Sequence, residues 1–194
     1  MKKQRTIIIF EGNDATGKSH LCESYFNECD DKHTMSFQTP YLVRGVIKNN
    51  NELTHLSRQL LSSASHFDLL RKYDVFHDCD IIQDRTFISS MVYFLTAKYN
   101  HIDEIKIAFM NDTEFIILKS MYDSLITSLF ERFDEIIIKH IKKSTPVGRF
   151  FDETDKDVFS SDIARWNLRN ETYDYILECY SNDFTIEVVF NEFE

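Results

Sequence analysis

Cysteine is scarce in this 194-residue chain, and its spacing matches neither a disulfide framework nor a metal site. None of the four cysteines belongs to a CxxC pair; they are Cys22, Cys29, Cys79 and Cys179. Free thiols are typical of a reducing compartment. The sequence also lacks any apolar run close to the roughly 18 residues of a membrane-spanning helix. We therefore expect a soluble, cytoplasmic protein with no membrane partner.

Basic charge is in deficit too, with 22 Lys and Arg against 32 Asp and Glu and a net charge of -10. Proteins that wrap an extended nucleic acid need many Lys and Arg side chains to displace counterions from phosphates. The charge balance therefore argues against such a partner, and against a kinase that acts on modified bases within DNA. A small anionic substrate needs only a few convergent cations and backbone amides, so it is compatible with the composition.

Glycine and proline are rare, with four glycines and two prolines. No repeat, low-complexity tract or linker rich in these residues divides the chain, and 43% of the residues are hydrophobic. A chain of this size can bury a complete core, so we expect one domain over residues 1–194.

Short β-branched runs alternate with longer helical patterns, which is typical of an α/β fold with a mostly parallel sheet. The predicted strands cover residues 7–10, 81–82, 115–118 and 184–190, with 34–37 as a further candidate. Apolar residues at three- and four-residue spacing predict helices. These cover residues 53–70, 87–98 and 163–180, where Trp166 belongs to the core, and others start at Lys18 and end near Ile141.

A glycine-containing loop follows the first predicted strand and opens onto a helix. It satisfies the pattern GxxxxGK[ST] with Gly12, Asn13, Asp14, Ala15, Thr16, Gly17, Lys18 and Ser19. Such a loop turns several backbone N–H groups toward one phosphate, and the helix adds its positive N-terminal end. Lys18 is expected to reach the β- and γ-phosphates of ATP, and Ser19 to bind Mg²⁺. Because switches, ATPases and kinases share this loop, it does not by itself predict a reaction.

A second charged pair, Asp84-Arg85, follows the predicted strand at residues 81–82. Open α/β sheets bind their ligands at the carboxyl ends of their strands. Asp84 is a candidate to bind Mg²⁺, directly or through water. Arg85 presents a planar fork that can hold a phosphate by two hydrogen bonds. A surface ion pair is the alternative interpretation of these two residues.

Two blocks of the chain resemble the thymidylate kinase family. Residues 10–14 read FEGND and precede Gly17-Lys18-Ser19, which is similar to the family's FEGxDxxGKS start. Asp84-Arg85, Ser89 and Val92-Tyr93 are similar to its DRYxxSxxAYQ segment, at matching intervals. Weaker similarity extends the resemblance, with gaps, from Phe10 to about Tyr173; it lies at residues 38–40, 60–64 and 168–173.

The resemblance implies a three-layer P-loop kinase fold, in which helices and a lid segment flank a five-stranded, mostly parallel sheet. It also implies ATP and Mg²⁺ as cofactors and a nucleoside monophosphate as the small-molecule substrate. Arg85 would hold the acceptor's phosphate, and Asp14 would accept a hydrogen bond from the sugar 3′-hydroxyl. Ser89 and Tyr93 would lie against the sugar or base, with an ordinary core position as the alternative for Tyr93. Whether the chain forms a homodimer, as its relatives do, is left open.

Three positions depart from the family in the region that reads the base. The family's stacking Phe corresponds to Ser62, its base-reading Arg to His66, and the Gln after the Tyr to Phe94. A thymine pocket is therefore not predicted, and the accepted base is left open. His66 is kept as a candidate substrate-binding residue, although a lone histidine on a helix is more often solvated or at the edge of the core.

A basic segment between two predicted helices is a candidate lid over about residues 142–158. Its basic run contains Pro146 and Gly148 and ends at Arg149. Cations that approach the transferring phosphoryl group as a site closes stabilise its charge. Arg149 is therefore a candidate catalytic residue, and Arg132 upstream is a candidate to bind ATP. A solvated basic turn is the alternative interpretation of the segment.

These observations favour phosphoryl transfer from ATP to a deoxynucleoside monophosphate, with Lys18, Asp84, Arg85 and Arg149 as catalytic residues. A monophosphate oxygen is already anionic, so charge screening and alignment suffice. A deoxynucleoside kinase, the second hypothesis, needs a carboxylate base, but Thr39-Pro40 stands after the second strand where similar enzymes carry one. Glu11 or Asp84 would then have to serve. A non-catalytic ATP-binding regulatory module is the third hypothesis, and the second phosphate-binding group at Arg85 argues against it.

Overall fold

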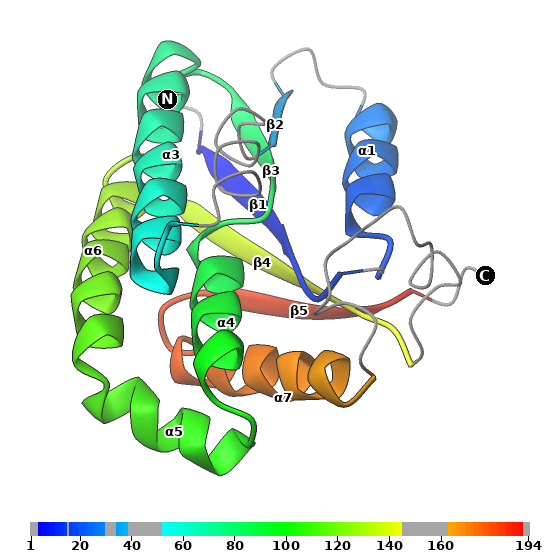
Figure 1. Ribbon diagram of the computed structural model, residues 1–194. Coiled ribbons are helices and arrows are strands. Elements are labelled where there is room, and N and C mark those ends of the chain that lie inside the picture. Colours follow the sequence, from blue (N-terminus) through cyan, green and yellow to red (C-terminus); the bar gives the residue numbers. More distant parts are fainter. Residues whose placement is uncertain (1–3, 15, 30–33, 39–51, 145–162, 192–194) are drawn as a thin grey trace.

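The residues described by the computed structural model are 4–14, 16–29, 34–38, 52–144 and 163–191. Within them, five strands form one sheet in the order β2-β3-β1-β4-β5, and every pairing is parallel (Figure 1). The strands are β1 (Thr6–Glu11), β2 (Thr34–Gln38), β3 (Asp80–Asp84), β4 (Glu135–Lys142) and β5 (Thr185–Phe190). The parallel sheet confirms the predicted α/β class.

Helices on both faces of the sheet give the molecule three layers. The described helices are α1 (Lys18–Glu28), α3 (His55–Val75), α4 (Phe87–Lys98), α5 (Ile102–Asn111), α6 (Thr113–Phe130) and α7 (Ile163–Cys179). In Figure 1, α1 lies on one side of the sheet and α3, α4, α6 and α7 lie on the other. No described helix is both long enough and apolar enough to span a membrane.

The central strand β1 contributes to two apolar clusters because successive side chains of a strand point to opposite faces. Ile7 and Ile9 are fully buried in the larger cluster, which the helices from α3 to α7 cover. Phe10 belongs to a smaller cluster with Cys22 of α1, against which Ile8 packs. A central strand buried on both faces is typical of a parallel sheet between two helical layers.

The predicted strand at residues 115–118 is wrong, because this segment lies inside α6. Phe115 and Leu118 are fully buried, whereas Ile116 and Ile117 are 46% and 49% exposed. This spacing of three residues between buried side chains is helical, and a strand would alternate. The N-cap residue Asp112 starts the helix, since its Oδ1 accepts a hydrogen bond of 2.9 Å from the Phe115 amide.

The predicted helix ending near Ile141 is also wrong, because residues 135–142 form β4. Ile136, Ile138 and His140 are buried at alternate positions, which is the pattern of a strand. β4 pairs with β1 on one side and with β5 on the other, so it is an interior strand. β4 is therefore one of the five strands of the sheet, whereas the strand predicted at residues 115–118 does not exist.

The carboxyl ends of the parallel strands meet at one edge of the sheet. β1 runs there into the loop of residues 12–19, and β3 runs into Arg85. Because the register pairs Phe10 with Asp84, Glu11 and Arg85 follow directly at the ends of adjacent strands. Of the candidate lid, residues 145–158 lie outside the described part of the chain.

Candidate active site

The loop between β1 and α1 takes a conformation that requires glycine at both ends. Gly12 has a φ of 142°, and a Cβ there would lie 2.4 Å from the Ile141 carbonyl oxygen on neighbouring β4. Gly17, with a φ of 78°, caps α1, which starts at Lys18. Both positive φ angles are strained for a residue with a side chain. The loop therefore has the strand-to-helix context that a phosphate-binding P-loop needs.

Asn191, directly after β5, holds the far side of this loop. Its Nδ2 donates a 2.7 Å hydrogen bond to the Thr16 carbonyl oxygen, and its backbone amide donates to Lys142. A Cβ on Gly17 would lie 2.3 Å from the same Nδ2. Nothing in the sequence marks Asn191 for this role, because the contact joins residues 175 positions apart.

Helix α7 fixes the loop from another direction. The Asn13 Nδ2 donates to the Trp166 carbonyl oxygen at 2.7 Å and to the Asn170 Oδ1 at 3.1 Å. The Trp166 Nε1 donates in turn to the Asp14 carbonyl oxygen at 3.0 Å. Trp166 is 2% exposed, as expected for a core residue, but its polar atoms also position the phosphate loop.

Lys18 folds back over the loop, where it is buried. Its Nζ donates to the Asn13 carbonyl oxygen and, at 3.4 Å, to the Thr16 Oγ1. Burial lowers the pKa of Lys18 to about 7, and the neighbouring Arg85 acts in the same direction. An anion such as a nucleotide phosphate would stabilise the charged form of Lys18 and restore a higher pKa.

Ser19 and Asp84 lie where a divalent cation would assist phosphate binding. The Ser19 Oγ donates to the Asp84 Oδ2 at 2.6 Å, so the two predicted Mg²⁺ ligands lie side by side. Asp84 is 7% exposed, and its Oδ1 is buried without a hydrogen-bond partner in the structure. A hydroxyl and a carboxylate are oxygen ligands of the type that Mg²⁺ prefers, so these residues fit that ion.

Arg85 reaches across the site from a strained backbone conformation. Its φ of 65° is the one positive value among the described residues other than glycine, and its amide donates to the Phe10 carbonyl oxygen. The Arg85 Nη2 lies 2.5 Å from the Asp14 Oδ1. Its Nη1 lies 3.2 Å from each of three oxygens, the Gly12 carbonyl, Ser89 Oγ and Tyr93 OH. The structure thus brings together Asp14, Arg85, Ser89 and Tyr93.

Asp14 is held in its ionised form by the surrounding cations. Burial alone would raise the pKa of this carboxyl, but Arg85, Lys18 and Arg169 outweigh that effect and keep the pKa well below its usual range. Its side chain is 37% exposed. Asp14 is therefore a charged hydrogen-bond acceptor that a ligand can reach from solvent.

A buried carboxylate behind Arg85 was not expected as a structural element of the site. Glu11 is fully buried and accepts hydrogen bonds from the Thr86 amide at 2.6 Å, the Thr86 Oγ1 at 2.7 Å and the Ser89 Oγ at 2.5 Å. Burial raises the pKa of Glu11, and the bonds from Ser89 and Thr86 oppose that rise. Because Thr86 follows Arg85 directly, these bonds fix the backbone that aims the guanidinium.

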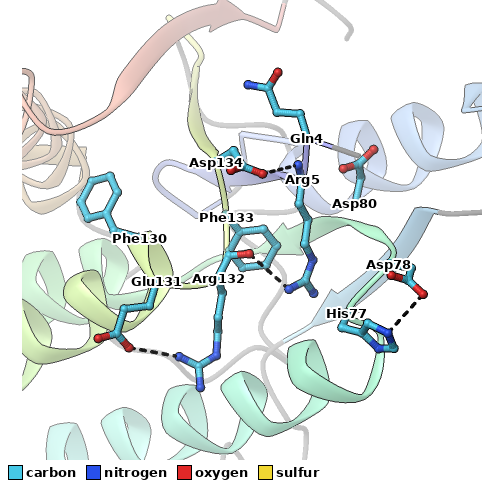
Figure 2. A pocket seen from close by; sticks show the side chains of 10 residues that line it. All are labelled: Gln4, Arg5, His77, Asp78, Asp80, Phe130, Glu131, Arg132, Phe133 and Asp134. Carbon is cyan, nitrogen blue, oxygen red and sulfur yellow. Dashed lines mark hydrogen bonds and ion pairs between the residues drawn. The ribbon is translucent and has the colours of Figure 1, made fainter. Parts of the chain in front are cut away.

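Arg132 does not lie at this site, so its predicted contact with ATP is wrong. It precedes β4, at the opposite edge of the sheet, and its guanidinium binds both oxygens of Asp74 at 2.8 and 3.0 Å. Figure 2 shows Arg132 beside Arg5 at a hollow of about 350 Å³ between the starts of the strands. Because residues 135–142 form β4 and not the predicted helix, Arg132 lies where this strand begins, away from the carboxyl ends of the strands.

His66 lies in α3 and is 4% exposed. Burial lowers the pKa of His66 to about 4, so the ring is neutral near pH 7. No described hydrogen bond joins it to Asp14, Arg85 or Tyr93, and contact with the substrate stays a prediction. Ala15, Arg149 and Thr39-Pro40 lie outside the described residues.

A parallel five-stranded sheet with a GxxxxGKS loop after its central strand is a P-loop kinase fold. Solved structures of nucleotide kinases resemble it over nearly the whole chain. Thymidylate kinase from Candida albicans matches with a TM-score of 0.62 and 19% identity, over 96% of this chain and 84% of that one. Thymidylate kinase from Ehrlichia chaffeensis matches with a TM-score of 0.63 and 16% identity, over 99% and 90%.

A deoxyadenosine kinase has the same degree of similarity. The M. mycoides enzyme, solved with bound dATP, matches with a TM-score of 0.65 and 16% identity, over 96% of this chain and 92% of that one. No family model matches the sequence, and no curated protein does. At identities of 16–19% the likeness establishes a nucleotide kinase fold and does not distinguish the substrate.

Proposed function

We propose that this protein is an ATP-dependent kinase that converts a deoxynucleoside monophosphate to the diphosphate. The observation that carries the proposal is Arg85, a nearly buried guanidinium held by strained backbone beside the P-loop. A guanidinium in such a position suits a second phosphate next to that of ATP, because it can bind two oxygens of one phosphate. A module that only binds ATP has no evident need of it.

The residues of the loop account for the donor. Backbone amides of the P-loop and the start of α1 would bind the β-phosphate, and Lys18 would reach the β- and γ-phosphates. Ser19 and Asp84 would hold Mg²⁺, which when bound reduces the repulsion between phosphate oxygens. Arg149 is retained as a candidate cation for the transferring group.

The other side of the site suits the acceptor. Arg85 would hold its phosphate in line with the γ-phosphate of ATP, and this alignment supplies most of the catalysis for an already anionic nucleophile. The exposed part of Asp14 would accept a hydrogen bond from the sugar 3′-hydroxyl. Ser89 and Tyr93 lie around the same guanidinium and would border the sugar.

Deoxynucleoside phosphorylation is the second candidate, and the likeness to a deoxyadenosine kinase supports it at the level of the fold. That reaction needs a carboxylate to accept the proton of a 5′-hydroxyl. Among the described residues, three carboxylates lie at the site, and each has another role. Glu11 is fully buried on Thr86 and Ser89, Asp14 is paired with Arg85, and Asp84 accepts from Ser19. This favours the monophosphate as acceptor.

The test is a coupled assay of ADP release with ATP and Mg²⁺, across the four deoxynucleosides and their 5′-monophosphates. We expect turnover of at least one monophosphate and none of the nucleosides. Lys18→Ala protein, purified in parallel, controls for contaminating host kinases. Turnover of nucleosides without turnover of monophosphates would replace the first candidate by the second, and ATP binding without any turnover would favour a regulatory module.

A further inference from the structure

Two buried side-chain atoms in the described residues lack a hydrogen-bond partner, and both belong to this site. One is the Asp84 Oδ1, an acceptor that suits a cation, as discussed above. The other is the Arg169 Nε, a donor on helix α7. Buried donors are nearly always paired in folded proteins, so an unpaired guanidinium nitrogen at a ligand site calls for a partner beyond the described residues.

Arg169 is positioned like a second Arg85. Its Nη1 lies 3.5 Å from the Asp14 Oδ2, while Arg85 approaches the other oxygen of the same carboxylate at 2.5 Å. Both guanidinium groups also face the Tyr93 ring, with distances from Cζ to the ring centroid of 4.7 Å for Arg169 and 5.7 Å for Arg85. The two cations therefore converge on one carboxylate and one aromatic ring, from α7 and from the end of β3.

Three cations of the described residues converge near Asp14. Lys18, Arg85 and Arg169 act together on Asp14. The carboxylates of Asp84 and Glu11 lie close by and accept hydrogen bonds from Ser19, and from Thr86 and Ser89, respectively. Asp14 pairs with both guanidinium groups, and the donors of these groups that Asp14 does not engage can bind a further anion.

We propose that Arg169 binds the 5′-phosphate of the acceptor together with Arg85, so that two guanidinium groups clamp one phosphate. Arg169 donates through Nε, and stacking on Tyr93 holds the plane of its guanidinium. The inference rests on the proposed monophosphate kinase activity and adds a residue that determines the preference for a phosphorylated acceptor. Within the sequence, Arg169 lies in the weakly matching segment of residues 168–173, where nothing distinguished it from a surface charge.

A purely structural role would be to tie α7 to the P-loop. Asn170 and Trp166 already make that connection through Asn13, with hydrogen bonds of 2.7 to 3.1 Å. The contact of Arg169 with Asp14 is longer, at 3.5 Å, and leaves Nε unused. Trp166 and Asn170 therefore attach α7 to the P-loop, and Arg169 is left to bind a ligand.

The experiment uses Arg169→Gln, with Arg165→Gln as the matched control one turn earlier on α7. Arg165 binds the Thr96 and Tyr99 carbonyl oxygens and the Asn100 side chain, away from the P-loop. Isothermal titration calorimetry gives the Kd for the preferred deoxynucleoside 5′-monophosphate, for the corresponding nucleoside and for ATP. Arg169→Gln should weaken monophosphate binding about tenfold or more, because a charged pair is lost, and change the other two much less.

Arg165→Gln should lower the melting temperature and leave all three affinities close to those of the wild type. Arg169→Lys should recover part of the monophosphate affinity, because it restores the charge without the fork. If Arg169→Gln weakens the binding of nucleoside and monophosphate equally, or weakens neither, the clamp is overturned even when the wild type phosphorylates monophosphates. A wild type that phosphorylates nucleosides alone would instead remove the proposed function, and the clamp with it.

Discussion

The Glu11 carboxylate accepts two hydrogen bonds from Thr86, one from its amide at 2.6 Å and one from its hydroxyl at 2.7 Å. These bonds hold the residue that follows Arg85. The φ of Arg85 itself is 65°, which is unfavourable for a residue that carries a Cβ. The strained conformation is the one that directs the guanidinium at Asp14. Glu11 is therefore a positioning residue that acts through Arg85.

Glu11→Gln should impair the acceptor side of the reaction and leave the fold intact. The amide retains the shape, but it weakens hydrogen bonds to a charged acceptor, each of which contributes roughly 1.5 to 3 kcal/mol. We expect kcat/KM for the monophosphate to fall about tenfold or more, with the KM for ATP nearly unchanged. Glu23→Gln, at an exposed position of α1, is the control. An unchanged kcat/KM would show that Arg85 keeps its conformation without Glu11.

Lys18→Ala should remove turnover without unfolding the protein. The substitution deletes the cation expected at the β- and γ-phosphates, and it also removes an ammonium whose burial is unfavourable in the absence of ligand, as the lowered pKa of about 7 indicates. The melting temperature should therefore be preserved or raised, while kcat falls by roughly a thousandfold or more. Circular dichroism and steady-state kinetics measure the two effects. Near-normal turnover in a folded variant is incompatible with a catalytic P-loop.

Asp14→Asn should reduce discrimination between acceptors with and without a 3′-hydroxyl. The amide fits the same space but replaces a charged acceptor by a neutral one, which makes a weaker hydrogen bond. The measurement is the ratio of kcat/KM for a deoxynucleotide and its 2′,3′-dideoxy analogue. Because Asp14 also pairs with Arg85, both substrates should lose some activity, and the ratio isolates the contact with the sugar. A ratio equal to that of the wild type would remove Asp14 from the recognition of the sugar.

His66 should make the fold sensitive to mild acid. Its folded-state pKa of about 4 lies below the unfolded value of 6.5, so the unfolded state binds more protons between these limits. Stability is therefore complete above pH 6.5 and is lost as the pH falls toward 4. Between pH 7.5 and 5.0 the contribution of this one group is about 2 kcal/mol.

Urea unfolding of the wild type and His66→Leu at pH 7.5 and 5.0 tests this contribution. The decrease in unfolding free energy on acidification should be smaller in the variant by that amount. The comparison is needed because His140, whose pKa burial also lowers to about 4, remains in both proteins. Equal decreases in the two proteins would place the titrating group elsewhere.

The sequence predicted the parts of the site that are local in the chain. The P-loop and the Asp84-Arg85 pair each occupy a few consecutive residues after a strand, and the structure places Ser19 beside Asp84 and Arg85 beside Asp14. Four of the five strands were located for the same reason, since short β-branched runs between loops are a local signal. Residues that contact one another across the sheet carried no such signal.

The errors have one physical origin, which is that short apolar runs suit either a helix or a strand. Phe115 to Leu118 was assigned to a strand, although the Asp112 cap and burial every third residue make it helical. The run at Ile136 to Ile138 was assigned to a helix, although pairing with β1 and β5 makes it a strand. The second error also led to the prediction that Arg132 binds ATP. Arg132 instead lies where β4 begins and pairs with Asp74.

The hydrogen bond from Asn191 to the Thr16 carbonyl oxygen also constrains when this protein can become functional during its synthesis. A ribosome produces the P-loop well before Asn191, because the residue that closes the loop against β5 is translated 175 positions after Thr16. Folding rates fall as such distant contacts accumulate, because the intervening chain must be ordered first. A nascent chain that ends before β5 therefore carries the complete nucleotide-binding motif and lacks the support that gives the motif its shape.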